Sequence, residues 1–275
     1  MPRTPSRTPS RTKARPDASE PAFDLNADAG ESYGPWRMGE DEALFPHLTS
    51  VNVACGFHAG DPLTMVRTVR LAAEHGVAVG AHPGLPDLLG FGRRDLAIDP
   101  SELHAAVVVQ IGALSAVLRA EGTGDLHHVK PHGALHHRMV RDEDAADAVA
   151  RAIAGAAPDA RLVTLAGPAG DGMRSAAARH DVRTVDEAFP DRGYLTDGRL
   201  APRGTDGALW TDPEAVAARA VRMVRDGTVE TVDGGVAEVR PDTLCLHGDH
   251  PGAAAIAQAV RAAAQAHGLR LAAYA

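Results

Sequence analysis

Short apolar segments alternate with amphipathic segments along the chain from about residue 21 onward. Seven of the apolar segments have the composition of strands, and segments with helical periodicity separate most of them. Such alternation predicts βαβ units and therefore a parallel sheet. The predicted strands are 23–27, 50–54, 77–81, 127–131, 161–166, 182–186 and 242–247.

Helix boundaries are marked by capping residues. Three aspartates precede prolines, a pairing typical of an N-cap and the first helical position, and a glycine stands where each of these helices would end. In the first helix we expect Leu63, Val66, Val69 and Ala73 to form the apolar face. The N-caps are Asp61, Asp99 and Asp212, the terminal glycines are Gly76, Gly122 and Gly227, and the predicted helices are 62–75, 101–121, 142–156, 169–180, 213–226 and 251–267.

A closed or nearly closed α/β barrel fits this pattern better than an open doubly wound sheet. Polar, glycine-bearing residues follow nearly every strand, whereas an open sheet concentrates them at one switch point. A length of 275 residues suits one such domain. We expect residues 190–210 to be a binding loop and residues 228–239 to be a hairpin that turns at Asp233-Gly234.

Composition and charge narrow the picture. Residues 1–20 repeat Arg, Thr, Pro and Ser and predict a disordered tail before a single domain at 21–275. The chain carries a net charge of −8, and an acidic body argues against a nucleic-acid partner. We expect no apolar stretch to form a signal-peptide core or to reach the roughly 18 residues that span a membrane. Two cysteines without a disulfide pattern predict the cytoplasm.

Histidines and carboxylates gather at the ends of the predicted strands. The carboxyl ends of parallel strands meet at one end of a barrel, so these side chains are expected to converge on one active site. The candidates are Asn26, Asp28, Glu31, His58, His82, Lys130, His132, Glu187, Arg192, His247 and Asp249.

Each candidate also has a structural alternative. Asp28 and Glu31 could cap a helix, bind a cation or act as a base, and Lys130 could clamp an anion or form a buried ion pair. Cys55 could be a nucleophile but fits better as a small buried residue. The sequence has no Gly-x-Ser-x-Gly elbow, Walker loop or strand-borne Gly-x-Gly-x-x-Gly. Together the groups favour hydrolysis, with or without a divalent metal.

Six segments resemble the signatures of the LamB/YcsF family in order and spacing. The resemblance runs from about residue 23 to 273. The segments are Asp24–Glu31, Asn52–Asp61, Gly80–Gly84, Val129–Leu135, Glu187–Tyr194 and Leu246–Asp249.

This resemblance implies an α/β fold, an incomplete (β/α)7 TIM-like barrel similar to glycoside hydrolases and deacetylases. Family members are described as the A component of a bacterial ATP-dependent 5-oxoprolinase. This enzyme converts 5-oxo-L-proline to L-glutamate, and its A component works together with subunits B and C. The resemblance therefore implies ATP, with Mg²⁺ as its partner, as cosubstrate. Whether this chain itself binds ATP or a metal stays open.

The resemblance also suggests roles for the candidates. Asp28 with His58 or His82 would handle water or a metal, and His132 and His247 would transfer protons. The substrate or phosphate would be bound by Asn26, Glu31, Lys130, Glu187, Arg192 and Asp249. Two rival hypotheses are a metal-dependent carbohydrate deacetylase-like hydrolase and a non-catalytic binding protein that completes a partner enzyme.

Overall fold

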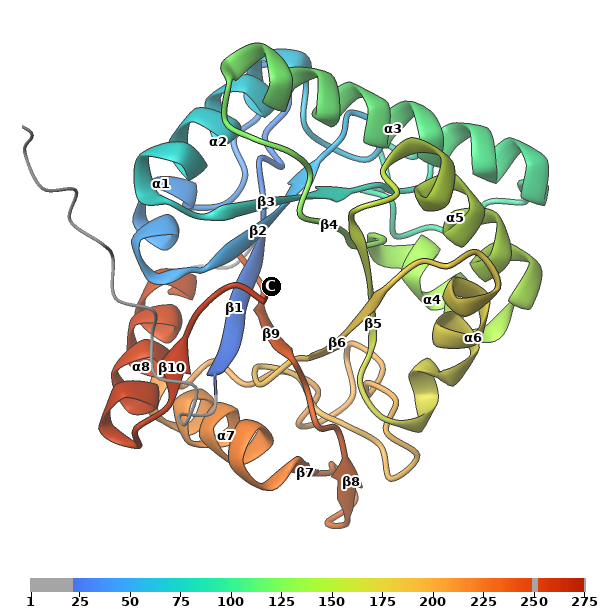
Figure 1. The fold of residues 1–275 in the computed structure, drawn as a ribbon. Helices are drawn as coiled ribbons and strands as arrows, with labels where there is room; N and C mark the ends of the chain where they lie inside the picture. Colours follow the sequence, from blue (N-terminus) through green and yellow to red (C-terminus); the bar gives the residue numbers. More distant parts are fainter. Residues whose placement is uncertain (1–21, 249–251, 275) are drawn as a thin grey trace, which may run out of the picture.

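The computed structural model describes residues 22–248 and 252–274, and Figure 1 shows them as a ring of parallel strands inside a ring of helices. The strand order is β1-β2-β3-β4-β5-β6-β9, and β9 pairs with β1, so the sheet closes on itself. All of these pairings are parallel. The strands are β1 (Ala22–Ala29), β2 (Ser50–Ala54), β3 (Ala78–His82), β4 (His128–Val129), β5 (Arg161–Leu165), β6 (Thr184–Ala188) and β9 (Thr243–Leu246).

The predicted seven-stranded α/β barrel is confirmed. Within residues 22–248 and 252–274, seven strands close the barrel, one fewer than in a full TIM barrel. β4 has two residues, because Pro131 follows Lys130 and has no N–H to continue the ladder. A short strand, β10 (Arg270–Leu271), adds to the start of β1, and the chain then ends over the middle of the barrel (Figure 1).

The helices form the outer layer. Asp61, Asp99 and Asp212 cap their helices as predicted, and the glycines at the far ends have φ near +66°. Around the barrel, α2 packs against α3, α3 against α5, α5 against α6, and α7 against α8. The helices are α1 (Asp41–Leu44), α2 (Pro62–His75), α3 (Pro100–Glu121), α4 (Gly133–Arg141), α5 (Glu143–Ala156), α6 (Asp171–Arg179), α7 (Pro213–Asp226) and α8 (Ala253–Ala266), with 3-10 turns at Phe45–His47 and Pro168–Gly170.

The predicted apolar face of α2 is wrong in part. Leu63 is 56% exposed and Ala73 is exposed, whereas the buried face consists of Thr64, Met65, Thr68, Val69 and Ala72. The threonine hydroxyls make this possible, because each hydroxyl finds a partner within the helix or at its cap: Thr68 donates to the Thr64 carbonyl at 2.9 Å, and Thr64 donates to Asp61 at 3.0 Å.

The expectation about apolar length needs a correction at α3. Among the described residues, this helix is long and apolar enough by composition to span a membrane. Its Leu103, Val107, Ile111 and Leu114 belong to the hydrophobic core, and the helix packs on α2 and α5. These buried residues are part of the 33% of the apolar window of α3 that lies inside the structure.

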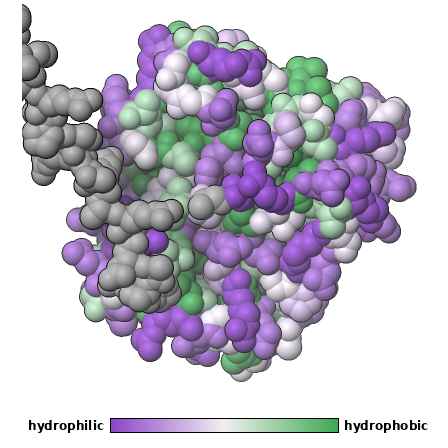
Figure 2. Space-filling model, in the orientation of Figure 1, coloured by the Kyte–Doolittle hydropathy of each residue, from purple (hydrophilic) through white to green (hydrophobic). Residues whose placement is uncertain are grey.

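Two further elements complete the fold. The predicted hairpin is present as antiparallel β7 (Thr228–Glu230) and β8 (Val236–Glu238). The molecular face in Figure 2 mixes hydrophilic and hydrophobic residues around the rim of the barrel. The predicted tail at 1–20, together with Asp249 and His250, lies outside the described residues.

Candidate active site

The interior of the barrel is polar along β1. Alternate residues of a barrel strand point inward, and on β1 these are Asp24, Asn26 and Asp28. Asn52 on β2 donates to Asn26 Oδ1 at 2.7 Å and to Asp28 Oδ1 at 2.9 Å. Burial lowers the pKa of His128, so its ring is neutral, and its Nε2 donates to Asn52 Oδ1 at 2.7 Å. This chain of hydrogen bonds fixes the Asp28 carboxylate.

Lys130, which follows β4, holds the centre of the site. Its Nζ lies 3.0 Å from Asp28 Oδ1, 3.1 Å from Glu187 Oε1 and 2.9 Å from Cys245 Sγ. Burial alone would lower the pKa of Lys130, but the neighbouring Asp28, Cys245 and Glu187 raise it well above its usual range. The three ammonium donors thus point at protein atoms. Lys130 contributes positive charge to the site and also forms the buried ion pair that was its structural alternative.

Glu187 and Asn26 lie beneath the site. Glu187 is 1% exposed, and burial raises the pKa of its carboxyl group. Asn26 donates from Nδ2 to Glu187 Oε1 at 3.0 Å and to Thr243 Oγ1 at 2.7 Å. Both residues were predicted to bind substrate or phosphate. In the structure Glu187 contacts Lys130, and Asn26 accepts from Asn52, which holds Asp28, so both residues position the groups of the site.

His82 and His132 meet beside Asp28. His82 donates from Nδ1 to the Lys130 carbonyl at 2.7 Å, and His132 donates from Nε2 to the Phe91 carbonyl at 2.8 Å. The remaining nitrogens, His82 Nε2 and His132 Nδ1, face each other at 3.0 Å, and His82 Nε2 lies 3.2 Å from Asp28 Oδ2. Burial lowers the pKa of His132 to about 3. Three basic atoms therefore converge at one point.

His58 completes a cluster of three histidines. Its ring stacks on His132 with 3.9 Å between centroids and 3° between planes, and it is fully buried. Neither ring nitrogen has a hydrogen-bond partner within the described ranges 22–248 and 252–274. One ligand atom from each of Glu31, His58, His82 and His132 lies within 4.8 Å of the others. This group could hold a metal ion.

His247 forms a second acid–base pair with Asp191. Asp191 Oδ2 accepts from His247 Nδ1 at 2.7 Å and from the His247 backbone N–H at 3.0 Å. Burial would raise the pKa of Asp191, but His247 lowers it below its usual range. The neighbouring Arg192 donates to the carbonyls of Ala208 and Ala201 and so fastens the predicted binding loop.

A cavity of about 290 Å³ opens at the carboxyl ends of the strands and brings most of the predicted residues together. Asp28, His82, Lys130, His132, Arg192 and His247 line it, whereas Asn26, Glu31, His58 and Glu187 are buried and not among the lining residues. The other lining residues are Arg93, Pro131, Gly133, Ala134, His136, His137, Phe189, Leu200 and Arg203.

Sequence reasoning missed part of this wall. Arg93 comes from the loop between β3 and α3, where residues 84–99 show neither helical nor strand periodicity. His136, which the sequence places in the same strand-end cluster as Lys130 and His132, lies with His137 on α4, a short helix rich in His and Arg that was not predicted. The charge of Arg93 was a usable signal, because it follows a strand end. The position of α4 depends on the Lys130-Pro131 turn and was not readable from periodicity.

The two cysteines are poor nucleophiles here. Burial raises the pKa of Cys55 to about 12, and its Sγ donates to the Val53 carbonyl at 3.1 Å. Burial also raises the pKa of Cys245, despite the nearby Lys130. Both thiols are free and buried.

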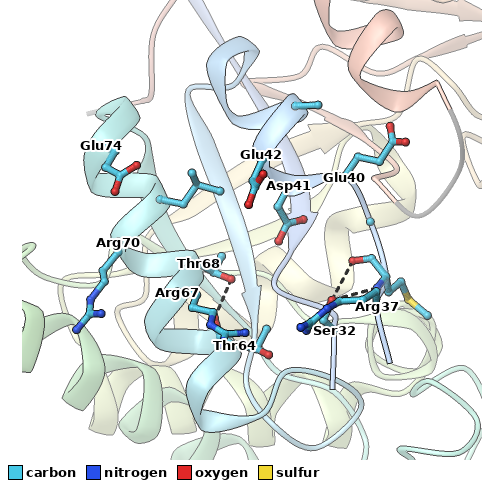
Figure 3. Close-up of a pocket in the computed structure, with 14 residues that line it drawn as sticks. Ser32, Arg37, Glu40, Asp41, Glu42, Thr64, Arg67, Thr68, Arg70 and Glu74 are labelled. Atoms are coloured by element: carbon cyan, nitrogen blue, oxygen red, sulfur yellow. Dashed lines mark hydrogen bonds between the residues drawn. The ribbon is translucent and has the colours of Figure 1, made fainter. Parts of the chain in front are cut away.

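A larger hollow of about 880 Å³ lies between α1, α2 and the loop after β1 (Figure 3). Glu40 and Glu42 project from one wall, and Arg67, Arg70 and Glu74 project from α2 on the other. These five side chains belong to exposed residues, so water screens their charges. The buried, convergent groups are in the smaller cavity, which is where we place the active site.

The fold and site define a barrel enzyme with its acid–base groups at the carboxyl ends of parallel strands. Residues 23–275 match the LamB/YcsF family, and the chain belongs to that family. It is 53% identical over 251 residues to a protein from Thermus thermophilus that is named as the A component of 5-oxoprolinase, covering 91% of this chain and 99% of the relative.

Two further comparisons agree. The protein of the same name from Deinococcus radiodurans is 53% identical over 249 residues, covering 90% of this chain and 96% of the relative. The crystal structure of a lactam utilization protein, also from Thermus thermophilus, superposes with a TM-score of 0.87 at 52% identity. That match covers 92% of this chain and 100% of the solved chain.

Proposed function

We propose that this chain is the lactam-hydrolysing A component of a 5-oxoprolinase, which opens 5-oxo-L-proline to L-glutamate. The observation that carries the proposal is the cavity in which Asp28, His82, His132 and His247 face cationic side chains. Close relatives that bear the 5-oxoprolinase name, and the lactam utilization protein, support the same substrate.

The charge of the cavity suits a small carboxylate substrate. Arg93, Lys130, Arg192 and Arg203 line it in a chain whose net charge is −8. A guanidinium binds a carboxylate through paired, charge-assisted hydrogen bonds. A volume of about 290 Å³ is at the small end of ligand sites and fits a single five-membered ring.

The acid–base groups are placed for opening an amide ring. In the proposed step, Asp28 takes a proton from water as it adds to the lactam carbonyl carbon, and His82 Nε2 lies beside that carboxylate at 3.2 Å. His247, held by Asp191, gives a proton to the ring nitrogen as the C–N bond breaks. Lys130 keeps Asp28 ionised, since it lies 3.0 Å from that carboxylate. The buried Asn52 and Glu187 hold Asp28 and Lys130, respectively, in position.

ATP and partner proteins are part of the proposal. An unstrained amide is unreactive, and phosphorylation of its carbonyl oxygen by ATP with Mg²⁺ would make the carbon a better electrophile. Water addition and C–N cleavage would then leave an acyl phosphate, which a second water hydrolyses, so that the products are glutamate, ADP and phosphate. The names of the relatives, which designate one lettered component of an enzyme, support a multi-subunit assembly, and we assign the other parts to subunits B and C. We place this enzyme in the cytoplasm, in keeping with the free thiols of Cys55 and Cys245.

The test is glutamate formation from 5-oxoproline, with this chain alone and with purified B and C subunits, each with and without ATP. We expect glutamate when ATP and all three proteins are present. Asp28→Asn in the complex should reduce the rate by a factor of about 100 to 10,000, the range for loss of a general base.

Three other outcomes would overturn the proposal. Hydrolysis of an acetylated sugar by the lone chain without ATP would favour the deacetylase-like alternative. Full activity of the complex with Asp28→Asn would favour the non-catalytic binding protein. Absence of glutamate with three folded, associated proteins would exclude 5-oxoproline as the substrate.

A further inference from the structure

The hydrogen bonds of His82 and His132 fix where their lone pairs point. Each ring uses one N–H to reach a backbone carbonyl, Lys130 O for His82 and Phe91 O for His132. In the neutral tautomers that make these two bonds, His82 Nε2 and His132 Nδ1 carry the lone pairs, and these two atoms face each other at 3.0 Å. A carbonyl that accepts from the outer N–H of an imidazole is the usual arrangement around metal-ligating histidines.

Negative charge adds to the same point. Asp28 Oδ2 lies 3.2 Å from His82 Nε2, and a Glu31 oxygen lies within 4.8 Å of ligand atoms of the three histidines. Lone pairs on two nitrogens and a carboxylate repel one another unless a cation lies between them. One shared proton could satisfy two of these atoms but leaves the others unsatisfied.

His58 distinguishes a metal ion from a proton. The ring is 0% exposed, and no described residue offers a hydrogen-bond partner to either nitrogen. A buried polar group without a partner is costly, so native proteins rarely keep one without a reason. Here the unpartnered ring is stacked on His132, directly beside the converging lone pairs.

Glycines make room for this cluster. A Cβ on Gly84 would lie 2.5 Å from His58 Nδ1. A Cβ on Gly92 would lie 2.8 Å from both His58 Cβ and His132 Cδ2. Backbone approaches the rings from two sides, so the imidazoles are held with little room to turn.

We propose that Glu31, His58, His82 and His132 form a binding site for one divalent transition-metal ion, with Asp28 beside it. Three imidazoles and a carboxylate suit Zn²⁺ and the neighbouring late first-row metals better than Mg²⁺ or Ca²⁺, which prefer oxygen ligands. His82 and His132 line the cavity, whereas His58 and Glu31 are buried and do not. The ion would therefore border the substrate site, as catalytic metals do. Its catalytic role rests on the proposed lactam hydrolysis, but its binding does not.

The test measures metal binding by the full-length chain, independently of turnover. The protein is treated with a chelator, dialysed, and titrated with Zn²⁺ and separately with Co²⁺, whose visible spectrum reports the number and type of ligands. We expect one equivalent per chain and a Co²⁺ spectrum typical of nitrogen ligands. His58→Asn and His132→Asn should each weaken binding by about 100-fold, the upper end of the losses seen when the surroundings of a metal site are altered.

His136→Asn is the matched control. His136 is also a buried histidine and lines the same cavity, but it is not in the four-residue group. The variant should bind metal as tightly as the unaltered chain, and a circular dichroism melt reports whether each variant is folded.

The outcomes separate this proposal from the proposed function. Less than about a tenth of an equivalent of Zn²⁺ on the folded, unaltered chain, or equal binding by His58→Asn and the unaltered chain, would overturn the metal site in favour of a shared proton. Full oxoprolinase activity after metal removal would confine the ion to a structural role. If the chain binds the metal but the complex forms no glutamate, the metal site stands and the proposed lactam reaction is excluded.

Discussion

At the scale of single residues, the site depends on charges that compensate one another around Lys130. Asp28 and Glu187 are both within 3.1 Å of its ammonium group, in an interior largely closed to water. Removing one partner of a buried ion pair is far more damaging than losing an exposed one, because the remaining charge has no solvent to stabilise it. The acidity of Asp28 and the position of Glu187 therefore both depend on this lysine.

Lys130→Met tests that dependence. It should lower the unfolding free energy by about 3–5 kcal/mol and the glutamate-forming activity of the complex by about 100-fold or more. Lys13 is the one other lysine in the sequence and belongs to the tail predicted at 1–20, so Lys13→Met is a natural control and should change neither quantity. Urea unfolding and the glutamate assay measure the two effects. An active, stable Lys130→Met variant would show that neither activity nor stability depends on Lys130.

Asp191 links the site to acid stability. Its pKa is lowered in the folded protein, chiefly because His247 offsets the effect of burial. A carboxyl group with a lowered pKa adds stability that is fully present above its unfolded pKa of about 3.9 and is lost as pH falls toward the folded value. Asp191→Asn should therefore lose stability at pH 6 and show a flatter stability profile as the pH falls below about 4. Parallel profiles for the two proteins would contradict this linkage.

The residues of the site were partly readable from sequence. Asp28, His82 and Lys130 were found because each follows an apolar strand, and strand ends converge in a barrel. Distances between such residues were not readable, so the sequence could not tell that Lys130 is occupied by Asp28, Glu187 and Cys245. Nor could it place Asn26 beneath the cavity, because that depends on the inward direction of its side chain.

At the scale of elements, strands and capped helices were predictable, whereas the buried faces and connecting loops were not. Asp61 and Gly76 mark the two ends of α2 by capping the helix locally, and such caps can be read directly from the sequence. Which face of α2 turns inward depends on the barrel it packs against, and Thr68 is buried there while Leu63 is exposed. The loop between β3 and α3 has no periodicity, yet its Gly92 packs directly against His58 and His132.

Gly92→Ala tests that loop. Gly92 has φ +62°, and an added Cβ would collide with His58 and His132. We expect a loss of about 2–4 kcal/mol of stability from backbone strain and overpacking, together with loss of activity because the histidines are displaced. Gly122→Ala is the matched control: it has φ +66° at the end of α3 and open space around the added carbon.

The control should cost about 1–2 kcal/mol, from the left-handed backbone alone, and leave activity unchanged. Thermal melts and the glutamate assay separate the two glycines. Equal activity of the two variants would mean that the histidine cluster tolerates displacement and is not part of the reaction.

At the scale of the whole molecule, the two ends of the barrel have different roles. The cavity lies at the carboxyl ends of the strands, and the chain terminus returns to their amino ends. There the Tyr274 carbonyl accepts from His127 Nε2 at 2.8 Å, and the tyrosine ring lies 4.5 Å from the His127 ring and 5.9 Å from the Arg161 guanidinium. β10 adds to β1 just before this contact. The C-terminal segment therefore helps to close the end of the barrel that carries no substrate.

Tyr274→Ala should accordingly affect stability and not catalysis. Loss of the ring contacts with His127 and Arg161 should lower the unfolding free energy by about 1–3 kcal/mol, while the backbone hydrogen bond to His127 remains. Tyr274→Phe keeps the ring and should be nearly neutral. Because the cavity is at the opposite end of the strands, kcat for glutamate formation by the complex should be the same for all three proteins below their melting temperatures. A fall in kcat for the folded Tyr274→Ala variant would show that the His128–Asn52–Asp28 hydrogen bonds carry a change from the closed end of the barrel to the site.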